Sequence, residues 1–114
     1  MAISIEDFKK VEIRAGKIVD AQPVEGSEKL LKLSVDFGSY SAECFGGTKQ
    51  VLSGIAKFVS IEELVGTTCA FVTNLEPREM MGLRSEAMIL AFSGDDFFSL
   101  LKVPNEVAPG TLVR

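Results

Sequence analysis

Side chains that could bind an anionic, hydrogen-bonding ligand gather between residues 74 and 88. Arg78 and Arg84 carry guanidinium groups, which pair with phosphate oxygens. Asn74 and Ser85 carry groups that hydrogen-bond to bases or sugars. This segment is therefore a candidate site for a phosphate-bearing ligand.

The same segment is rich in methionine and in residues typical of turns. Its methionines, which offer an adaptable apolar surface to a base but more often fill a core, are Met80, Met81 and Met88. Pro77 and Gly82 favour turns, so a plain connection between two strands explains the segment equally well.

Composition argues against catalysis. The chain contains no histidine, which removes the commonest general base and most nucleophile triads. Cys44 and Cys69 lie in apolar, strand-like segments and are interpreted as small buried residues, because two thiols alone do not make a zinc site. Asp95 and Asp96 are interpreted as a solvated turn and not as a catalytic pair of carboxylates, since adjacent side chains point apart. The sequence predicts no enzyme activity, no metal and no cofactor.

Length and charge narrow the functional classes further. The 114 residues, 46% of them hydrophobic, suit one domain with one core. The net charge of −4 excludes a broad basic surface, so any RNA site must be local. There is no apolar run near the roughly 20 residues that cross a bilayer, nor a signal-peptide pattern, which predicts a cytoplasmic protein without a membrane partner.

The N-terminal third predicts a short helix followed by a curved strand. Ser4 and Asp7 indicate a helical turn that runs through Phe8 and plugs one end of a barrel. From Val11 the pattern alternates with period two, and Gly16 suggests a bulge that curves the strand through residue 18.

Further strands follow, with one helix among them. Leucine, valine and phenylalanine alternate with polar residues from 31 to 37, and an interrupted strand covers 40–45 and 50–52. Ser60 and Glu63 form a capping box for a short helix that ends at Gly66. Two more β-rich runs cover 67–75 and 86–93, joined by a polar loop.

Five strands with a helix between the third and fourth predict an all-β fold, a five-stranded OB-fold Greek-key barrel. We expect residues 1–114 to form one domain, with the barrel at about 11–94 and an extension at about 95–114. The extension carries more apolar side chains than such a barrel needs, which predicts that it mediates homodimerisation.

Long stretches of the chain resemble the stand-alone tRNA-binding domain family. They are VEIRAGKIVDAQPVEGSEKLLKLSVDFG, SGIAKF, EELVG, NLEPREMMGLRSEAMIL and VPNEVAPGTLVR. That family includes the C-terminal domain of bacterial methionyl-tRNA synthetases, free dimeric tRNA-binding proteins and a protein-secretion chaperone. The resemblance implies an OB fold that dimerises through its C-terminal extension and recognises the outer corner of tRNA.

The resemblance also implies an RNA-binding face. Its residues would be Lys29, Lys57, Asn74, Arg78, Ser85, Glu86 and Met88. Lys49 stands where the family usually has arginine, which keeps the charge but loses the bidentate fork. Glu76 and Glu79 reverse the usual charge near Arg78, and Ala87 replaces a common glycine, so we expect weak RNA binding in isolation.

Two functions from different classes follow. The first is structure-selective tRNA binding by a non-catalytic homodimer, which as an accessory of methionyl-tRNA synthetase or another aminoacyl-tRNA synthetase would raise the local tRNA concentration. The second is a chaperone-like dimer that binds extended polypeptide in an apolar groove and assists secretion. The acidic composition mildly favours the second, and the SGIAK motif favours the first.

Overall fold

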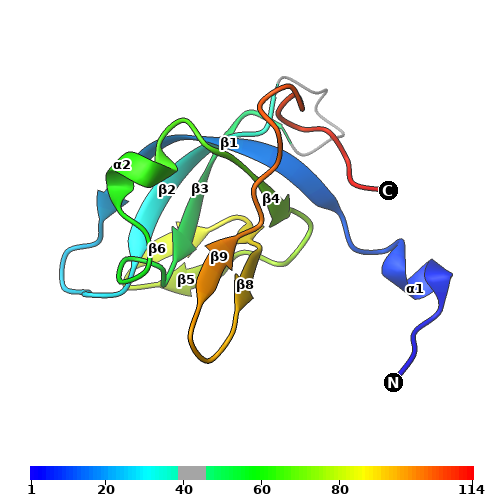
Figure 1. Ribbon diagram of the computed structural model, residues 1–114, viewed down its shortest axis with the longest axis horizontal. Helices are drawn as coiled ribbons and strands as arrows, with labels where there is room; N and C mark the ends of the chain where they lie inside the picture. Colours follow the sequence, from blue (N-terminus) through cyan, green and yellow to red (C-terminus); the bar gives the residue numbers. More distant parts are fainter. Residues whose placement is uncertain (39–45) are drawn as a thin grey trace.

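The computed structural model describes residues 1–38 and 46–114 and has an antiparallel, curled sheet at its centre (Figure 1). In spatial order the sheet contains β3 (Thr48–Ser53), β2 (Leu31–Asp36), β1 (Ile13–Pro23), β4 (Thr68–Val72) and β7 (Met88–Ile89). Helix α2 (Ile61–Leu64) lies between β3 and β4 in the chain. The predicted all-β, OB-type fold with a helix after the third strand is confirmed.

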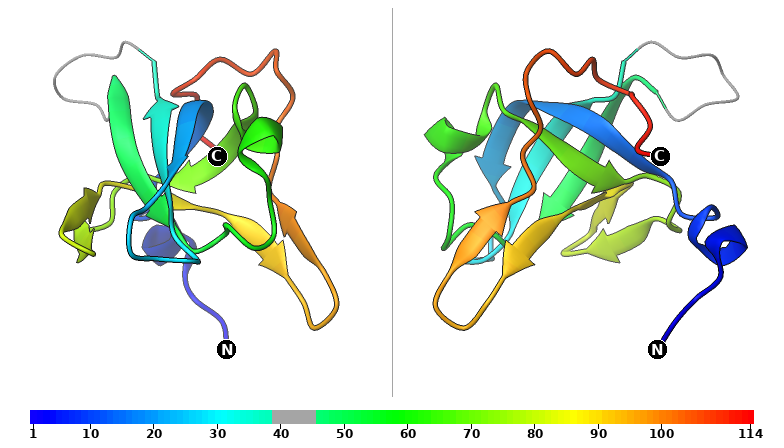
Figure 2. Two further views of the ribbon diagram at one scale, coloured as in Figure 1. Left: turned by 90° about the vertical axis from the view of Figure 1, so that its left-hand side faces the viewer. Right: turned by 45° about the vertical axis from the view of Figure 1, so that its right-hand side comes forward.

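The long strand β1 joins the two halves of the sheet. Its first residues pair with β4 and its later ones with β2, and Figure 2 shows how strongly it curves between them. The predicted bulge at Gly16 is wrong, because the register shifts between Ile18 and Asp20 instead. Gly16 is needed for close approach: a Cβ there would lie 2.6 Å from side-chain atoms of both Phe37 and Val35.

The core lies inside the curled sheet. The predicted alternation of β2 is confirmed, since Leu31, Leu33, Val35 and Phe37 are buried and the residues between them are half-buried. The rings of Phe37 and Phe71 meet edge to face with centroids 5.3 Å apart. Burying each such side chain contributes about 1.5–3 kcal/mol to folding.

Helix α2 begins as the sequence predicts. The Ser60 hydroxyl accepts a hydrogen bond from the Glu63 backbone N–H at 3.2 Å and donates one to the Glu63 carboxylate at 3.0 Å. Gly66 ends the turn with a positive φ of 90°, and its N–H donates to the Ile18 carbonyl beside the bulge. Buried Leu64 fixes the helix against the core.

Helix α1 (Ile5–Phe8) has the predicted Ser4 cap but does not plug the barrel. It has no buried residue, and Phe8 is 44% exposed. Figure 2 shows the helix standing away from the sheet. The side chains that fill the interior come from the sheet itself, among them the fully buried Ile18, Phe37 and Phe71.

Two short hairpins occupy places where the sequence predicts a loop and a continuous strand. The polar loop contains β5 (Arg78–Met80) paired with β6 (Leu83–Ser85). The run 86–93 divides into β7 and β8 (Ala91–Ser93), and β8 pairs with β9 (Phe98–Leu100) of the predicted extension. The predicted strand over 40–45 and the burial of Cys44 lie outside the described residues.

Part of the C-terminal extension covers the protein's own barrel. Leu100 is buried in the core. Further on, the Ala15 N–H donates to the Thr111 carbonyl at 2.9 Å, and the Val113 N–H donates to the Ile13 carbonyl at 2.8 Å. Intramolecular packing therefore uses some of the apolar surface that the sequence assigns to dimerisation. Among the described residues, no helix is long and apolar enough to span a bilayer.

Candidate nucleic-acid interface

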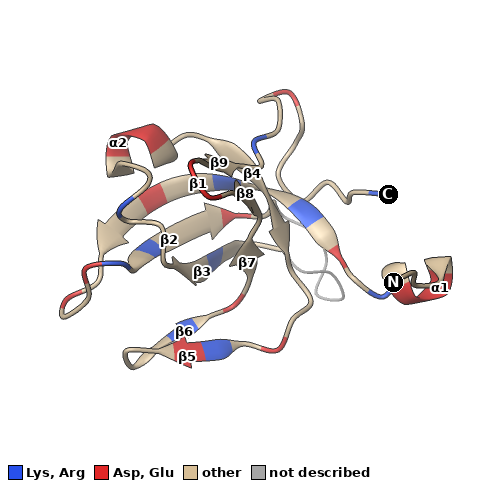
Figure 3. Ribbon diagram, turned by 60° about the horizontal axis from the view of Figure 1, so that its bottom comes forward, with Lys and Arg blue, Asp and Glu red and all other residues tan. Residues whose placement is uncertain are grey.

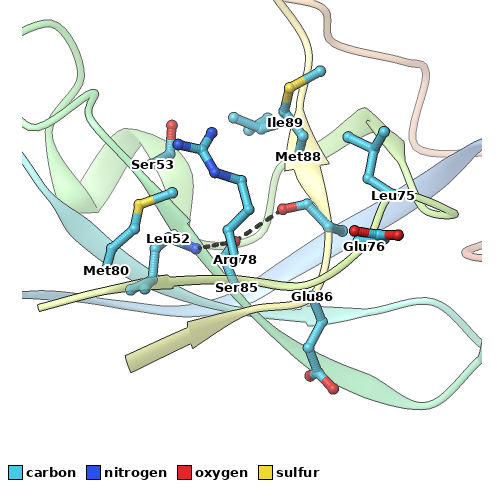
Figure 4. A pocket seen from close by; sticks show the side chains of 11 residues that line it. Leu52, Ser53, Leu75, Glu76, Arg78, Met80, Ser85, Glu86, Met88 and Ile89 are labelled. Carbon is cyan, nitrogen blue, oxygen red and sulfur yellow. Dashed lines mark hydrogen bonds between the residues drawn. The ribbon is translucent and has the colours of Figure 1, made fainter. Parts of the chain in front are cut away.

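A small groove lies where the β5–β6 hairpin meets the end of β3 and β7 (Figure 4). It encloses about 80 Å³, and we call it the hairpin groove. Its lining residues are Leu52, Ser53, Leu75, Glu76, Arg78, Met80, Ser85, Glu86, Ala87, Met88 and Ile89. In Figure 4 the Arg78 side chain extends between Met80 and Met88 towards Ser53. A guanidinium flanked by methionines can bind a phosphate while a base or sugar contacts the thioethers.

The hairpin separates the two arginines that the sequence groups together. Arg78 pairs with Ser85, and Glu79 pairs with Arg84. Because side chains alternate between the faces of a strand, Arg78 faces the groove and Glu79 and Arg84 face the opposite side. Glu79, which is expected from the sequence to weaken phosphate binding by Arg78, therefore pairs across the hairpin with Arg84. Glu76, by contrast, lines the groove together with Arg78.

Two predicted RNA-binding residues close the barrel. The buried Ser85 hydroxyl accepts a hydrogen bond from the Leu52 N–H and donates one to the Ala87 carbonyl, both at 3.0 Å. The Glu86 carboxylate accepts from the Gln50 N–H at 3.1 Å, and the Glu86 N–H donates to the Gln50 carbonyl at 2.9 Å. These bonds join β6 and the residue after it to β3, and in Figure 4 the Glu86 side chain points away from Arg78.

Asn74 and Lys49 lie outside the hairpin groove. The Asn74 side-chain oxygen accepts from the Glu12 N–H at 2.8 Å, and its amide nitrogen donates to the Lys10 carbonyl. Asn74 thus ties the end of β4 to the start of β1. Lys49 pairs with Val35 at the other end of β3 from Ser53, about 13 Å away at the usual strand rise. Their contact with RNA stays a prediction.

Lys29 and Lys57 lie on neighbouring exposed loops. The Ala56 N–H donates to the Lys29 carbonyl at 2.9 Å, which holds the β1–β2 loop against the segment after β3. That segment begins at Ser53 in the groove wall. The tip of the hairpin is also near, because a Cβ on Gly26 would lie 3.3 Å from the Met81 methyl group. The two lysines and the groove therefore form one side of the molecule.

The charge distribution on this side of the molecule is mixed. Figure 3 shows acidic positions on α1 and α2, and also on β5 beside its arginine and on the β1–β2 loop. With a net charge of −4 and these neighbouring carboxylates, attraction of a polyanion is confined to the exposed cations Lys29, Lys57 and Arg78. In the described part of the chain, no three histidine, cysteine or acidic residues come together to hold a metal ion.

Sequence reasoning missed the apolar walls of the groove and a stacked pair of aromatic rings, of which one is exposed and the other half-buried. Leu75 and Ile89 line the groove, and Phe58 stacks on Phe98 next to Lys57. The sequence alone does not predict the hairpin that borders the groove. Its two-residue turn consists of Met81 and Gly82, which both have positive φ, as in a type I′ turn. Glycine in the second position was the available signal.

Comparison with known proteins gives consistent matches. The family described as "Putative tRNA binding domain" matches residues 13–112. Methionine–tRNA ligase of Methanoregula boonei is 47% identical over 112 residues, which are 98% of this chain and 16% of the ligase. The ligase of Clostridium tetani is 42% identical over 114 residues, 98% of this chain and 17% of that protein. The chain thus spans less than a fifth of these relatives.

Solved structures agree with the sequence matches. The MetRS related protein from Pyrococcus horikoshii has a TM-score of 0.89 and 30% identity, covering 100% of this chain and 99% of that one. The chaperone CsaA of Bacillus anthracis has a TM-score of 0.84 and 26% identity over the whole of both chains. By family match, sequence identity and fold, the chain belongs to the tRNA-binding domain family that includes domains of methionine–tRNA ligases.

Proposed function

We propose that this protein binds tRNA without catalysing a reaction, through the hairpin groove and the adjoining lysines Lys29 and Lys57. The observation that carries the proposal is the position of Arg78, an exposed residue whose side chain lies between two methionines at the groove. Arginine can form two parallel hydrogen bonds to one phosphate, and the lysines add positive charge for further phosphates of a folded RNA. The protein would distinguish tRNA from other RNAs by the shape of the folded molecule more than by its base sequence.

The protein would act as a homodimer of single-domain chains in the cytoplasm. Helix α1, the residues that follow it and the C-terminal residues together form a hollow, the terminal apolar surface. It is lined by the apolar side chains of Ile5, Phe8, Val11, Leu112 and Val113, with the charged residues Lys9, Glu12 and Arg114 among them. Phe8, Ile5 and Val113 are each about half exposed or more, as expected of a surface that a second copy covers. This surface refines the predicted extension at about 95–114, because α1 and the residues just after it contribute to it as well.

A role as an accessory of an aminoacyl-tRNA synthetase fits a weak intrinsic affinity. A tethered or associated RNA-binding module raises the local tRNA concentration, so modest contacts suffice. The ligases that match this chain carry a similar domain within a longer protein.

The test is fluorescence anisotropy with unfractionated tRNA and with an RNA duplex of similar length, at two salt concentrations. We expect tRNA to bind more tightly. Arg78→Gln should weaken tRNA binding about tenfold and reduce the salt dependence by about one phosphate contact. Arg84→Gln is the matched control, because its side chain faces the other side of the hairpin. Equal losses in the two variants would contradict the proposed groove.

A triple variant tests the whole face. Replacing Lys29, Lys57 and Arg78 with alanine should abolish binding and flatten its salt dependence. All three side chains are exposed, so the fold should tolerate the change. Binding that persists unchanged in this variant would place the RNA elsewhere.

Polypeptide binding is the second candidate function, favoured by the similarity to the chaperone CsaA and by the terminal apolar surface. If that surface instead mediates homodimerisation, it is covered and unavailable to a client. An aggregation assay with an unfolding protein should then show little suppression at equimolar dimer. Strong suppression, together with absent tRNA binding, would reverse the ranking.

A further inference from the structure

An aromatic pair stands on the surface beside the lysine loops. The rings of Phe58 and Phe98 are nearly parallel, with centroids 4.7 Å apart and an interplanar angle of 17°. Phe98 packs against the hydrophobic core, whereas Phe58 is 62% exposed. One face of the Phe58 ring therefore packs on Phe98, and the other face is open to a ligand. We call this pair the aromatic platform.

The backbone beneath the platform is fixed on both sides. On one side, buried Ile55 anchors the turn, and its carbonyl accepts the Phe58 N–H at 2.9 Å. On the other, Phe98 lies in β9 directly opposite Ser93 of β8. A pre-positioned ring loses little conformational entropy when a ligand stacks on it.

Charged side chains of both signs surround the platform. A shallow hollow of about 550 Å³ is lined by the two platform rings, Phe97, Lys57, Asp95 and Asp96. Lys57 is also linked to the Lys29 loop through the bond between Ala56 and Lys29. The hollow therefore offers a flat apolar face, a cation for a phosphate and carboxylates for N–H donors.

An unpaired nucleotide carries all three complementary groups. Its base stacks on an aromatic ring whatever its sequence, because every base has a π-face. Its phosphate pairs with lysine, and a base edge rich in N–H groups donates to carboxylate oxygens. Guanine presents such donors on its Watson–Crick edge, whereas uracil presents mostly acceptors. An uncharged apolar ligand would leave the lysine and the aspartates without partners.

We propose that the aromatic platform binds one unpaired base of the RNA, stacked on Phe58, with its phosphate at Lys57 and a preference for guanine set by Asp95 and Asp96. This rests on the proposed RNA-binding function and extends the hairpin groove by a base-binding subsite. It also gives a role to the two aspartates that the sequence assigns to a solvated turn.

A tryptophan reporter tests the subsite directly. The chain contains no tryptophan, so Phe58→Trp introduces a single indole at the platform, and stacking of a base quenches its fluorescence. The probes are two single-stranded RNA heptamers, UUUGUUU and UUUUUUU. We expect saturable quenching by both and at least fivefold tighter binding of the guanine heptamer. Phe92→Trp is the matched control, because Phe92 is similarly exposed but faces the other side of β8.

Saturable quenching that is equal in the two tryptophan variants would overturn the subsite. Asp95→Asn combined with Asp96→Asn, in the Phe58→Trp background, should remove the preference for guanine and keep the quenching. A preference that survives this change would overturn the role of the aspartates.

Binding of whole tRNA separates failure of the subsite from failure of the proposed function. Phe58→Leu should weaken tRNA binding about five- to one-hundredfold, whereas Phe58→Tyr and Phe92→Leu should retain it. If the wild-type protein binds tRNA and Phe58→Leu binds equally well, the subsite is wrong and the groove stands. If the wild-type protein binds no tRNA at any salt concentration, the proposed function itself is wrong.

Discussion

Single residues set how tightly this small barrel closes, and Gly16 is the clearest example. We predict that Gly16→Ala lowers the free energy of unfolding by about 1–3 kcal/mol, because the added methyl group would overlap Val35, Phe37 and Phe71. Gly54→Ala is the control, since a Cβ there meets no atom within 4 Å. Urea unfolding of both variants measures the difference. An equal, small effect in both would show that the core can move aside.

The buried thiol of Cys69 gives a pH dependence of stability. Burial raises the pKa of Cys69 from its ordinary value of 9.0 to about 11, and the positive charge of Lys102 opposes this shift. Between pH 9 and 11 the unfolded chain loses the thiol proton while the folded chain keeps it. Stability therefore falls as the pH rises through this window, and Cys69 contributes no such slope below it.

We predict that the wild-type protein loses about 2 kcal/mol more than Cys69→Ala between pH 8 and pH 10.5. Denaturant midpoints of both proteins at the two pH values measure this, because the two proteins differ only in the side chain of residue 69. Parallel losses in the two proteins would mean that the thiol ionises in the folded state. Slow labelling of Cys69 by a thiol reagent at pH 8 provides an independent check.

At the scale of elements, the β5–β6 hairpin connects the candidate site to the closure of the barrel. Ser85 lies on it and is buried with both its hydrogen bonds made. Ser85→Ala leaves the Leu52 N–H and the Ala87 carbonyl without this partner, so we predict a loss of about 1–3 kcal/mol in unfolding free energy. Ser93→Ala, at an exposed position, should change it by less than about 0.5 kcal/mol.

The thermal unfolding of these two serine variants distinguishes a structural role from a binding role. If Ser85→Ala keeps its stability but loses affinity for tRNA, the hydroxyl contacts RNA as the family resemblance implies. If it loses stability, as we expect, its effect on affinity comes through the position of Arg78 opposite it in the hairpin.

The sequence predicts elements well where local chemistry determines them. The alternation of residues 31–37 and the Ser60 cap need only neighbouring residues, and both are confirmed. The hairpin was missed because each of its strands has three residues, too few for a pattern of period two. Consequently Arg78 and Arg84 were grouped by proximity in the chain, although the hairpin places them on opposite faces.

Features that depend on distant contacts were not predictable from local patterns. The bulge lies at Val19, two residues after the last pair between β1 and β4, and no residue type there indicates it. Helix α1 has an apolar side that suggests burial, but the interior was already filled by residues far away in the sequence. The bonds of Ser85 and Glu86 to β3 join residues far apart in the chain and are not visible in the sequence either, while contact of these two residues with RNA stays a prediction.

At the scale of the whole molecule, the terminal apolar surface is the one through which we propose that two copies associate. It combines α1 with the C-terminal residues, which the bonds between β1 and residues 111–113 hold in place. Burying exposed phenylalanine, isoleucine and valine side chains between two copies gains about 25 cal/mol per Å² of apolar surface removed from water. A single buried charge would oppose this gain strongly.

We therefore predict that light scattering gives a mass of about 25 kDa for the wild-type protein, twice the 12.3 kDa of one chain. Phe8→Glu combined with Val113→Glu should give a monomer with an unchanged circular dichroism spectrum, because both side chains are exposed in a single chain. Val65→Glu, at a similarly exposed position after α2, should remain dimeric. A wild-type monomer at micromolar concentration would instead leave this surface available to another protein, which the chaperone-like function requires.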